Sequence, residues 1–239
     1  MRMKRIVGFV LLLVLMVGAA CSWYLGDYYR ADERAVTAFY PESRGTQVDL
    51  EGKGIACLPE EPVAGLIFYP GGKVEHTAYQ PLMEACAARN ILCVLVEMPF
   101  RLAVLDMDRA QGIREEFPQV ERWYIGGHSL GGAIAAGYLE KTEEEYQGLV
   151  LLASYSTADL SEKELQVLSV YGDCDQVLNG EKYKECLANL PEDYREVVLE
   201  GGCHSGFGFY GPQEGDGVPT LSAEEQILLT AQAIEELIT

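Results

Sequence analysis

The chain has 239 residues, which suits one large domain, and 49% of them are hydrophobic, enough to fill a core. Its 37 acidic residues outnumber the 18 basic ones, and the resulting net charge of −19 argues against a nucleic-acid partner. The sequence has no repeats and no zinc-type Cys-x-x-Cys spacing, so we expect no metal, no cofactor and no obligate protein partner.

The N-terminal segment is predicted to be a membrane anchor. Residues 6–25 carry no charge, and 20 residues of helix are long enough to cross a hydrocarbon core of about 30 Å. Basic residues before this stretch and acidic ones after it place the following domain outside the cytoplasm. Two alternatives stay open: cleavage of a signal peptide after the small residues before Cys21, giving a secreted protein, or lipidation of Cys21. We therefore divide the chain into 1–29, an anchor or signal segment, and 30–239, a folded domain.

Strands and helices are predicted to alternate through the domain. Two short strands are expected within 46–60, followed by buried strands where apolar runs are continuous: 64–70, 91–99, 122–128, 148–155 and 166–172, with a last strand at 194–200. Helices are expected between or after them, at 77–90, near 105–117, and at 130–141, 181–190 and 222–237. This alternation predicts an α/β fold, with a mostly parallel sheet of about eight strands, helices on both faces and an antiparallel edge.

A glycine-rich turn joins the strand ending at 128 to the next helix. Its residues Gly127–Gly131 fit the pattern G-x-S-x-G, a nucleophile elbow in which a sharp turn exposes Ser129. The glycines are needed because this turn brings the backbone close to its neighbours. The helix start also offers the free N–H of Leu130 to a developing oxyanion. These features predict that Ser129 is a catalytic nucleophile.

A serine nucleophile needs a base and an orienting acid, which follow it along the chain in this type of fold. Of the three histidines only His204 follows Ser129, because His76 precedes it and His128 lies inside the elbow, where it more readily fills a structural slot. The acid is expected at the end of the strand 166–172. There Asp175 is favoured over Asp173, because a loop carboxylate reaches a histidine more freely than one directly at the strand end.

The motifs together resemble those of the α/β-hydrolase superfamily, specifically its small, membrane-anchored bacterial members of the dienelactone-hydrolase and esterase type. The matching segments are "YPGGKV" from residue 69, "GGHSLGG" from 126, G-x-x-D from 172 and "GG-x-H" from 201. The resemblance covers about residues 45–239 and assigns the acid to Asp175. It also implies that Gly72, or failing it Lys73, donates the second oxyanion N–H.

The predicted activity is hydrolysis of ester-like bonds in small molecules. His204 would take the proton of Ser129, Leu130 and Gly72 would hold the oxyanion, and water would clear the acyl-enzyme. Because His204 acts as a base only when neutral, hydrolysis should fall in acid. Lys73 and Arg101 follow strand ends, where they either bind an anionic substrate group or remain solvated charges.

The connection between the strands 148–155 and 166–172 is too short for a lid domain. We therefore expect an open pocket that favours short-chain or exposed esters. A peptidase or a thioesterase would share every motif found here. A membrane-tethered binding module without activity is the alternative from another class, and the presence of all three triad residues disfavours it.

Overall fold

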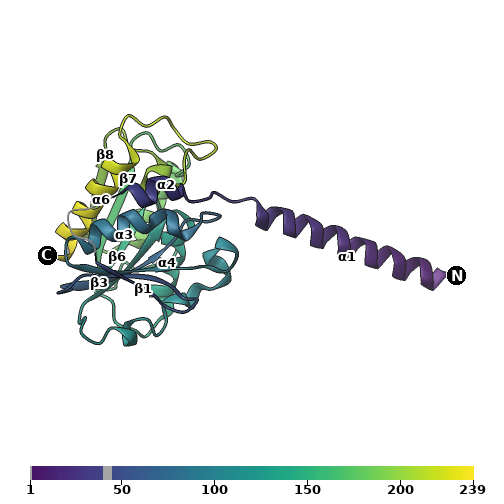
Figure 1. Ribbon diagram of the computed structural model, residues 1–239, viewed down its shortest axis with the longest axis horizontal. Helices are drawn as coiled ribbons and strands as arrows, with labels where there is room; N and C mark the ends of the chain where they lie inside the picture. The colour runs from purple at the N-terminus through teal and green to yellow at the C-terminus, as the bar shows by residue number, and fades with distance from the viewer. Residues whose placement is uncertain (1, 40–44) are drawn as a thin grey trace.

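The computed structural model describes residues 2–39 and 45–239, without the side chains of residues 2–5 and 8, so the expected basic flank lies outside the described side chains. The first helix, α1 (Arg2–Gly26), extends away from the domain (Figure 1). In the described part of the chain it alone is long and apolar enough to cross a membrane, with a mean hydropathy of 2.1 over Phe9–Gly26. A signal sequence meets the same criterion, so the division of the chain at residue 29 stays a prediction.

The domain is built on one eight-stranded sheet, which confirms the predicted fold class. Its strands lie in the order β1-β2-β4-β3-β5-β6-β7-β8, and only the pairs β1–β2 and β2–β4 are antiparallel. Each strand coincides with an expected one: β1 (Thr46–Asp49), β2 (Gly54–Leu58), β3 (Ala64–Tyr69), β4 (Ile91–Val96), β5 (Trp123–His128), β6 (Gly148–Leu152), β7 (Gln166–Gly172) and β8 (Arg195–Leu199).

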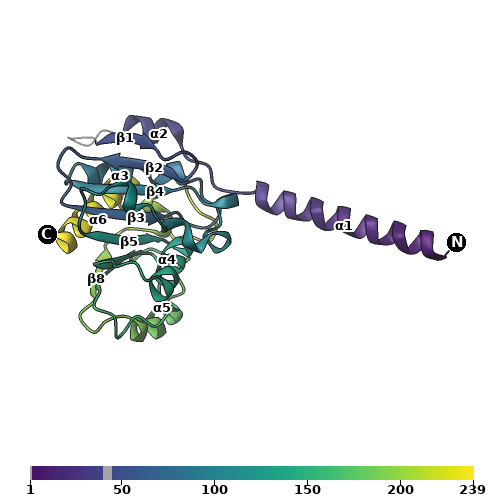
Figure 2. The ribbon, with the colours of Figure 1, turned by 90° about the horizontal axis from the view of Figure 1, so that it is seen from below.

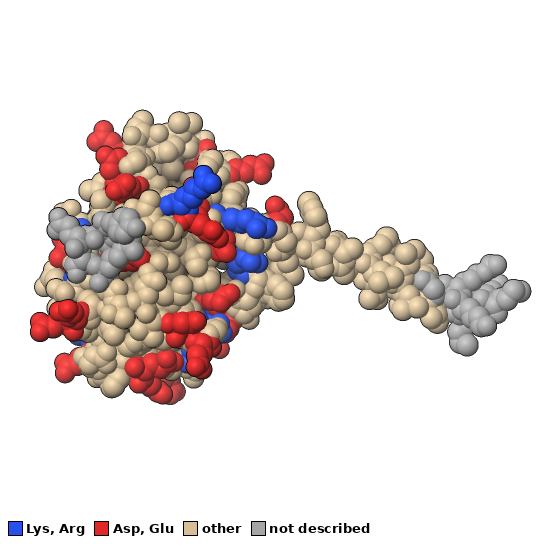
Figure 3. Space-filling model, viewed as in Figure 1, with Lys and Arg blue, Asp and Glu red and all other residues tan. Residues whose placement is uncertain are grey.

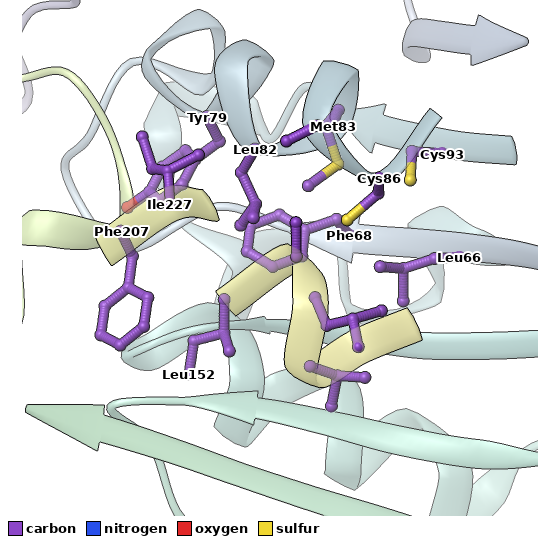
Figure 4. Packing of buried hydrophobic residues seen from close by; sticks show 14 of the residues in the cluster. Leu66, Phe68, Tyr79, Leu82, Met83, Cys86, Cys93, Leu152, Phe207 and Ile227 are labelled. Carbon is purple, nitrogen blue, oxygen red and sulfur yellow. The ribbon is translucent and has the colours of Figure 1, made fainter. Parts of the chain in front are cut away.

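Helices cover both faces of the sheet, as the turned view shows (Figure 2). On one face, α3 (Gln80–Ala87) packs over β4 and α6 (Ala223–Ile238) packs over β7, and the two helices contact each other. Phe68, Leu82 and Ile227 belong to the hydrophobic cluster on this face (Figure 4). The other face carries α4 (Leu130–Lys141) and α5 (Gly180–Cys186). Burial of these apolar surfaces supplies the main stabilising free energy.

Two local differences from the expected elements have visible causes. The helix expected near 105–117 is replaced by 3₁₀ turns at Ala103–Leu105, Met107–Ala110 and Arg114–Glu116. Here the hydroxyl of Tyr69 donates to the carbonyl of Met107 and accepts the N–H of Ala110, so a side chain takes the backbone bonds that a helix would use. The short helix α2 (Glu33–Ala38), capped by Asp32, was not expected.

The connection between β6 and β7 contains neither a helix nor a strand. Within residues 153–165, Thr157 and Asp159 are exposed, whereas Ser156, Ala158 and Leu160 are buried. The stretch therefore forms part of the domain's own packing. The thiols of Cys174, Cys186 and Cys203 are free.

Candidate active site

Ser129 occupies a strained turn between β5 and α4. Its backbone has φ 52° and ψ −122°, a conformation that residues with a side chain rarely adopt. The surrounding glycines hold this turn, because a Cβ on Gly131 would lie 2.3 Å from the carbonyl oxygens of Tyr69 and Pro70. A Cβ on Gly127 would lie 2.5 Å from the same Tyr69 oxygen. The local structure is thus the elbow that the sequence pattern predicts.

His204 lies beside Asp175 in the interior. The Nδ1 atom of His204 is 2.8 Å from Oδ2 of Asp175, and both side chains are 1% exposed. The other oxygen of Asp175 accepts the backbone N–H groups of Val177 and Leu178, which hold the carboxylate in place. Asp173 instead accepts the N–H of Gly201 at 2.7 Å. The structure therefore places Asp175, and not Asp173, next to the histidine.

Ser129 and His204 line the same cavity of about 440 Å³. The Nε2 atom of His204 is buried and has no hydrogen-bond partner within the described ranges, which leaves it free to accept a proton. Most of the remaining lining is apolar or small: Leu130, Ala133, Ile134, Ala153, Ser154, Tyr155, Thr157, Val177, Leu178 and Asn179. The cavity can accommodate a small apolar group next to the serine.

Gly72 lies against the first turn of α4. A Cβ on Gly72 would meet the Leu130 side chain at 2.8 Å, so the two predicted oxyanion donors are neighbours. The amides on either side of Gly72 are engaged: Gly71 donates to the Tyr79 hydroxyl at 3.2 Å and Lys73 donates to the Arg101 carbonyl at 2.8 Å. This geometry favours Gly72 over Lys73 as the donor from this loop.

Lys73 and Arg101 contact the end of α1 and the residues that follow it. The Lys73 ammonium is 2.9 Å from the Asp27 carboxylate and 4.6 Å from the ring centre of Tyr24. The Arg101 guanidinium stacks 3.5 Å from the ring centre of Tyr28. Neither side chain is among the described residues that line the cavity. Substrate binding by Lys73 and Arg101 stays a prediction.

Two polar side chains fix the loop that carries His204, and neither was predicted from the sequence. Asp216 accepts the N–H groups of His204 and Ser205, at 3.1 and 2.9 Å, together with the Ser205 hydroxyl. Burial opposes ionisation of Asp216, but these hydrogen bonds outweigh it and hold its pKa below the usual value. The fully buried Gln226 pairs with the backbone N–H and carbonyl of Cys203. The sequence offered one signal for Gln226: it is a polar residue on the apolar face of the last helix.

The ring of His128 packs against the ring of His204. Their ring centres are 4.6 Å apart, and Nδ1 of His128 is 2.8 Å from the hydroxyl of Tyr79, which also accepts the Gly71 N–H. Burial, with a smaller contribution from His204, lowers the pKa of His128 well below its usual value. A neutral imidazole thus connects the elbow, the loop after β3 and His204.

This buried imidazole predicts a pH dependence of stability. The folded state keeps His128 neutral, whereas the unfolded chain binds a proton in acid. The contribution of His128 to the free energy of unfolding is therefore complete above about pH 6.5. Below that pH the free energy of unfolding falls, by at most about 1.4 kcal/mol per pH unit. Urea unfolding of the full chain in detergent between pH 7.5 and 5.5 measures this. His128→Asn should show a shallower decline. Parallel profiles for the two proteins would contradict the assignment, since His76 and His204 are common to both.

Comparisons with known proteins address the fold of the chain. No curated protein matches by sequence. Among solved structures, TT1662 from Thermus thermophilus is similar with a TM-score of 0.60 and 16% identity, over 82% of this chain and 99% of that one. A predicted CIB-like hydrolase from Thermoplasma acidophilum has a TM-score of 0.59 and 15% identity, over 81% and 98%. A dienelactone hydrolase from Anabaena variabilis has a TM-score of 0.55 and 14% identity, over 81% and 95%.

These similarities, all below 25% identity, establish the shared fold. The model of the alpha/beta hydrolase family matches residues 65–228, which include the elbow, the Asp175 loop and the His204 loop. Of the described residues, no group of three or more His, Cys, Asp and Glu side chains is arranged to hold a metal ion. From the family match and the eight-stranded sheet together, the chain belongs to the alpha/beta hydrolase family.

Proposed function

We propose that the protein is a serine hydrolase that cleaves ester-like bonds of small or exposed substrates. The observation that carries the proposal is the placement of Ser129 on a strained elbow, lining one cavity with His204, whose other nitrogen faces Asp175. Strained residues that persist in a packed structure cluster at functional sites. The structural similarity to a dienelactone hydrolase is consistent with hydrolysis of an ester.

The mechanism follows from the protons that each group can hold. Asp175 accepts the Nδ1–H of His204, which fixes the tautomer in which Nε2 is a base. His204 takes the hydroxyl proton of Ser129 as Oγ bonds to the carbonyl carbon, and the carbonyl oxygen becomes an anion. The N–H groups of Leu130 and Gly72 stabilise this anion. His204 then gives the proton to the leaving alkoxide. In the second half of the reaction His204 takes a proton from water, whose oxygen attacks the acyl carbon. The proton then passes to Ser129 Oγ as the bond to the acyl group breaks and the acid is released.

The site's dimensions suggest the class of substrate. The cavity of about 440 Å³ suits a short acyl group, and the segment 153–165 is not a lid domain. In this proposal α1 is retained as a single-pass anchor that holds the domain on the extracytoplasmic side of the cell membrane. Support for the anchor comes from the uncharged 18-residue stretch Phe9–Gly26 and the exposure of its apolar side chains.

Covalent labelling tests the proposed chemistry. The full chain, purified in detergent, is treated with a fluorophosphonate and its intact mass is measured beside that of Ser129→Ala. We expect a single adduct on the wild type and none on the variant, because the phosphonate reacts only with an activated serine. A folded wild type that gains no adduct would contradict the proposal, and the membrane-tethered binding module would then be the better account.

A further inference from the structure

The chain passes almost directly from α1 to the loop that follows β3. Tyr29 forms a parallel bridge with Val74: its N–H donates to the Lys73 carbonyl at 2.8 Å and its carbonyl accepts the Glu75 N–H at 2.9 Å. Only two residues separate Tyr29 from Gly26, where α1 ends. Three residues of extended chain span at most about 11 Å. Tyr29 therefore lies within that distance of the helix end, and the loop that carries Gly72 is one hydrogen-bonded step further, whatever the angle at which α1 leaves the domain.

This junction lies at the edge of the sheet formed by the carboxyl ends of its parallel strands, where the candidate active site also lies. Gly72, Ser129, Asp175 and His204 follow the ends of β3, β5, β7 and β8. The C-terminus marks the opposite edge, because the carbonyl of Ile238 accepts a hydrogen bond from the Arg122 side chain, one residue before β5 begins. Figures 1 and 2 both show α1 and the C-terminus at opposite ends of the domain. A membrane crossed by α1 would thus face the active-site edge.

The loop after β4 presents apolar side chains at this same edge. Phe100, Val104 and Leu105 are 59%, 53% and 56% exposed. Outside α1, no other three exposed large apolar side chains lie so close together along the described chain. Phe100 and the adjacent Arg101 both have positive φ, 51° and 60°, an unfavourable pair for residues with side chains. The Arg101 carbonyl accepts the Lys73 N–H, so this loop is joined to the loop that carries Gly72.

The charge at this edge differs from that of the rest of the molecule. Lys73, Arg101 and Arg30 gather around the junction, where Arg101 and Arg30 both lie over the ring of Tyr28. In the space-filling view, several basic groups lie where α1 meets the domain, while acidic groups outnumber basic ones over the rest of this face (Figure 3). Apolar side chains combined with Arg, Lys and aromatic rings are typical of surfaces that lie in the interface of an anionic bilayer.

We propose that the segment 99–105 docks on the anionic bilayer that α1 crosses. Phe100, Val104 and Leu105 enter the boundary between headgroups and acyl chains, and Arg101 contacts the headgroups. The active site then receives its substrate from the membrane surface, as an ester that combines a short acyl group with an amphiphilic alcohol. The docking rests on the proposed anchor, and the substrate class rests on the proposed hydrolase activity.

A fluorescent label on the loop tests the docking without any catalytic step. Cys21 and Cys174, the two thiols that are not buried, are first replaced by Ser in the full chain. The environment-sensitive dye NBD is then attached at Leu105→Cys, or at the matched control Val63→Cys, which is 44% exposed at the opposite edge, directly before β3. In nanodiscs that contain phosphatidylglycerol, emission at position 105 should rise about threefold over that in detergent as the dye leaves water, and spin-labelled lipid should quench it. Equal emission and equal quenching at the two positions would overturn the docking, as would a chain that does not remain in the membrane.

Hydrolysis by variants tests the substrate class separately. The double variant Phe100→Ser with Leu105→Ser is compared with Val63→Ser on a short-acyl ester of an amphiphilic alcohol in vesicles and on a water-soluble short-acyl ester. We expect kcat/KM of the double variant to fall about tenfold on the vesicle ester and to stay unchanged on the soluble one. An equal fall on both esters, or on neither, would overturn the substrate class. If the wild type hydrolyses neither ester, the proposed function has failed, and the NBD measurement still decides the docking.

Discussion

Asp175→Asn is expected to lower kcat by about four orders of magnitude with little change in KM. The side chain touches Nδ1 of His204, and an amide group there can donate a hydrogen bond to that nitrogen. His204 would then carry its proton on Nε2, where it cannot act as a base toward Ser129. The retained oxygen can still accept the N–H groups of Val177 and Leu178, so the fold should survive. Steady-state kinetics on a soluble short-acyl ester, with thermal unfolding as the check on folding, measures the effect.

Asp173→Asn is the matched control for this prediction. The residue lies two positions away and makes the same kind of bond, accepting the N–H of Gly201, but it does not contact His204 in the structure. An asparagine oxygen can replace that bond, so kcat should stay within about tenfold of the wild type. If Asp173→Asn proved the more damaging of the two, the role of the acid would move to Asp173 and the predicted triad would be wrong.

The sheet and the elbow were predictable because their signals are local. Each buried strand is a continuous apolar run between turn residues, and the glycines around Ser129 mark a turn that excludes side chains. The pairing of His204 with Asp175 was predictable because chain order left few alternatives, and the structure agrees by placing the two side chains in contact. The catalytic roles themselves remain predictions.

The missed features depend on contacts between distant parts of the chain. The hydroxyl of Tyr69 replaces backbone bonds 38 and 41 residues away, so no local pattern could show that the expected helix near 105–117 would break into 3₁₀ turns. Asp216 holds the backbone of His204 across a long loop, and its sequence neighbourhood resembles an ordinary turn. Similarly, the proximity of the segment 99–105 to the end of α1 emerges only when Tyr29 pairs with Val74.

The elbow also predicts a large effect on stability. Gly131→Ala would place a methyl group 2.3 Å from the carbonyl oxygens of Tyr69 and Pro70. Both contacts are with backbone atoms at the end of β3, so relief requires the sheet and α4 to separate. We expect the free energy of unfolding to fall by at least about 4 kcal/mol, at the severe end of single substitutions. Fluorophosphonate labelling of Ser129 should be lost with it.

Gly137→Ala, six residues further along the same helix, separates this steric effect from a general effect of replacing glycine in α4. A Cβ there meets nothing closer than the Met107 side chain at 3.5 Å, an ordinary contact. Because alanine is the better helix former, this control should raise the free energy of unfolding by about 0.5–1 kcal/mol and leave labelling intact. Urea unfolding and intact-mass labelling of both variants, in the same detergent, measure the difference. Wild-type stability in Gly131→Ala would show that α4 can move away from β3, and Ser129 would then not need the tight elbow to hold its strained backbone.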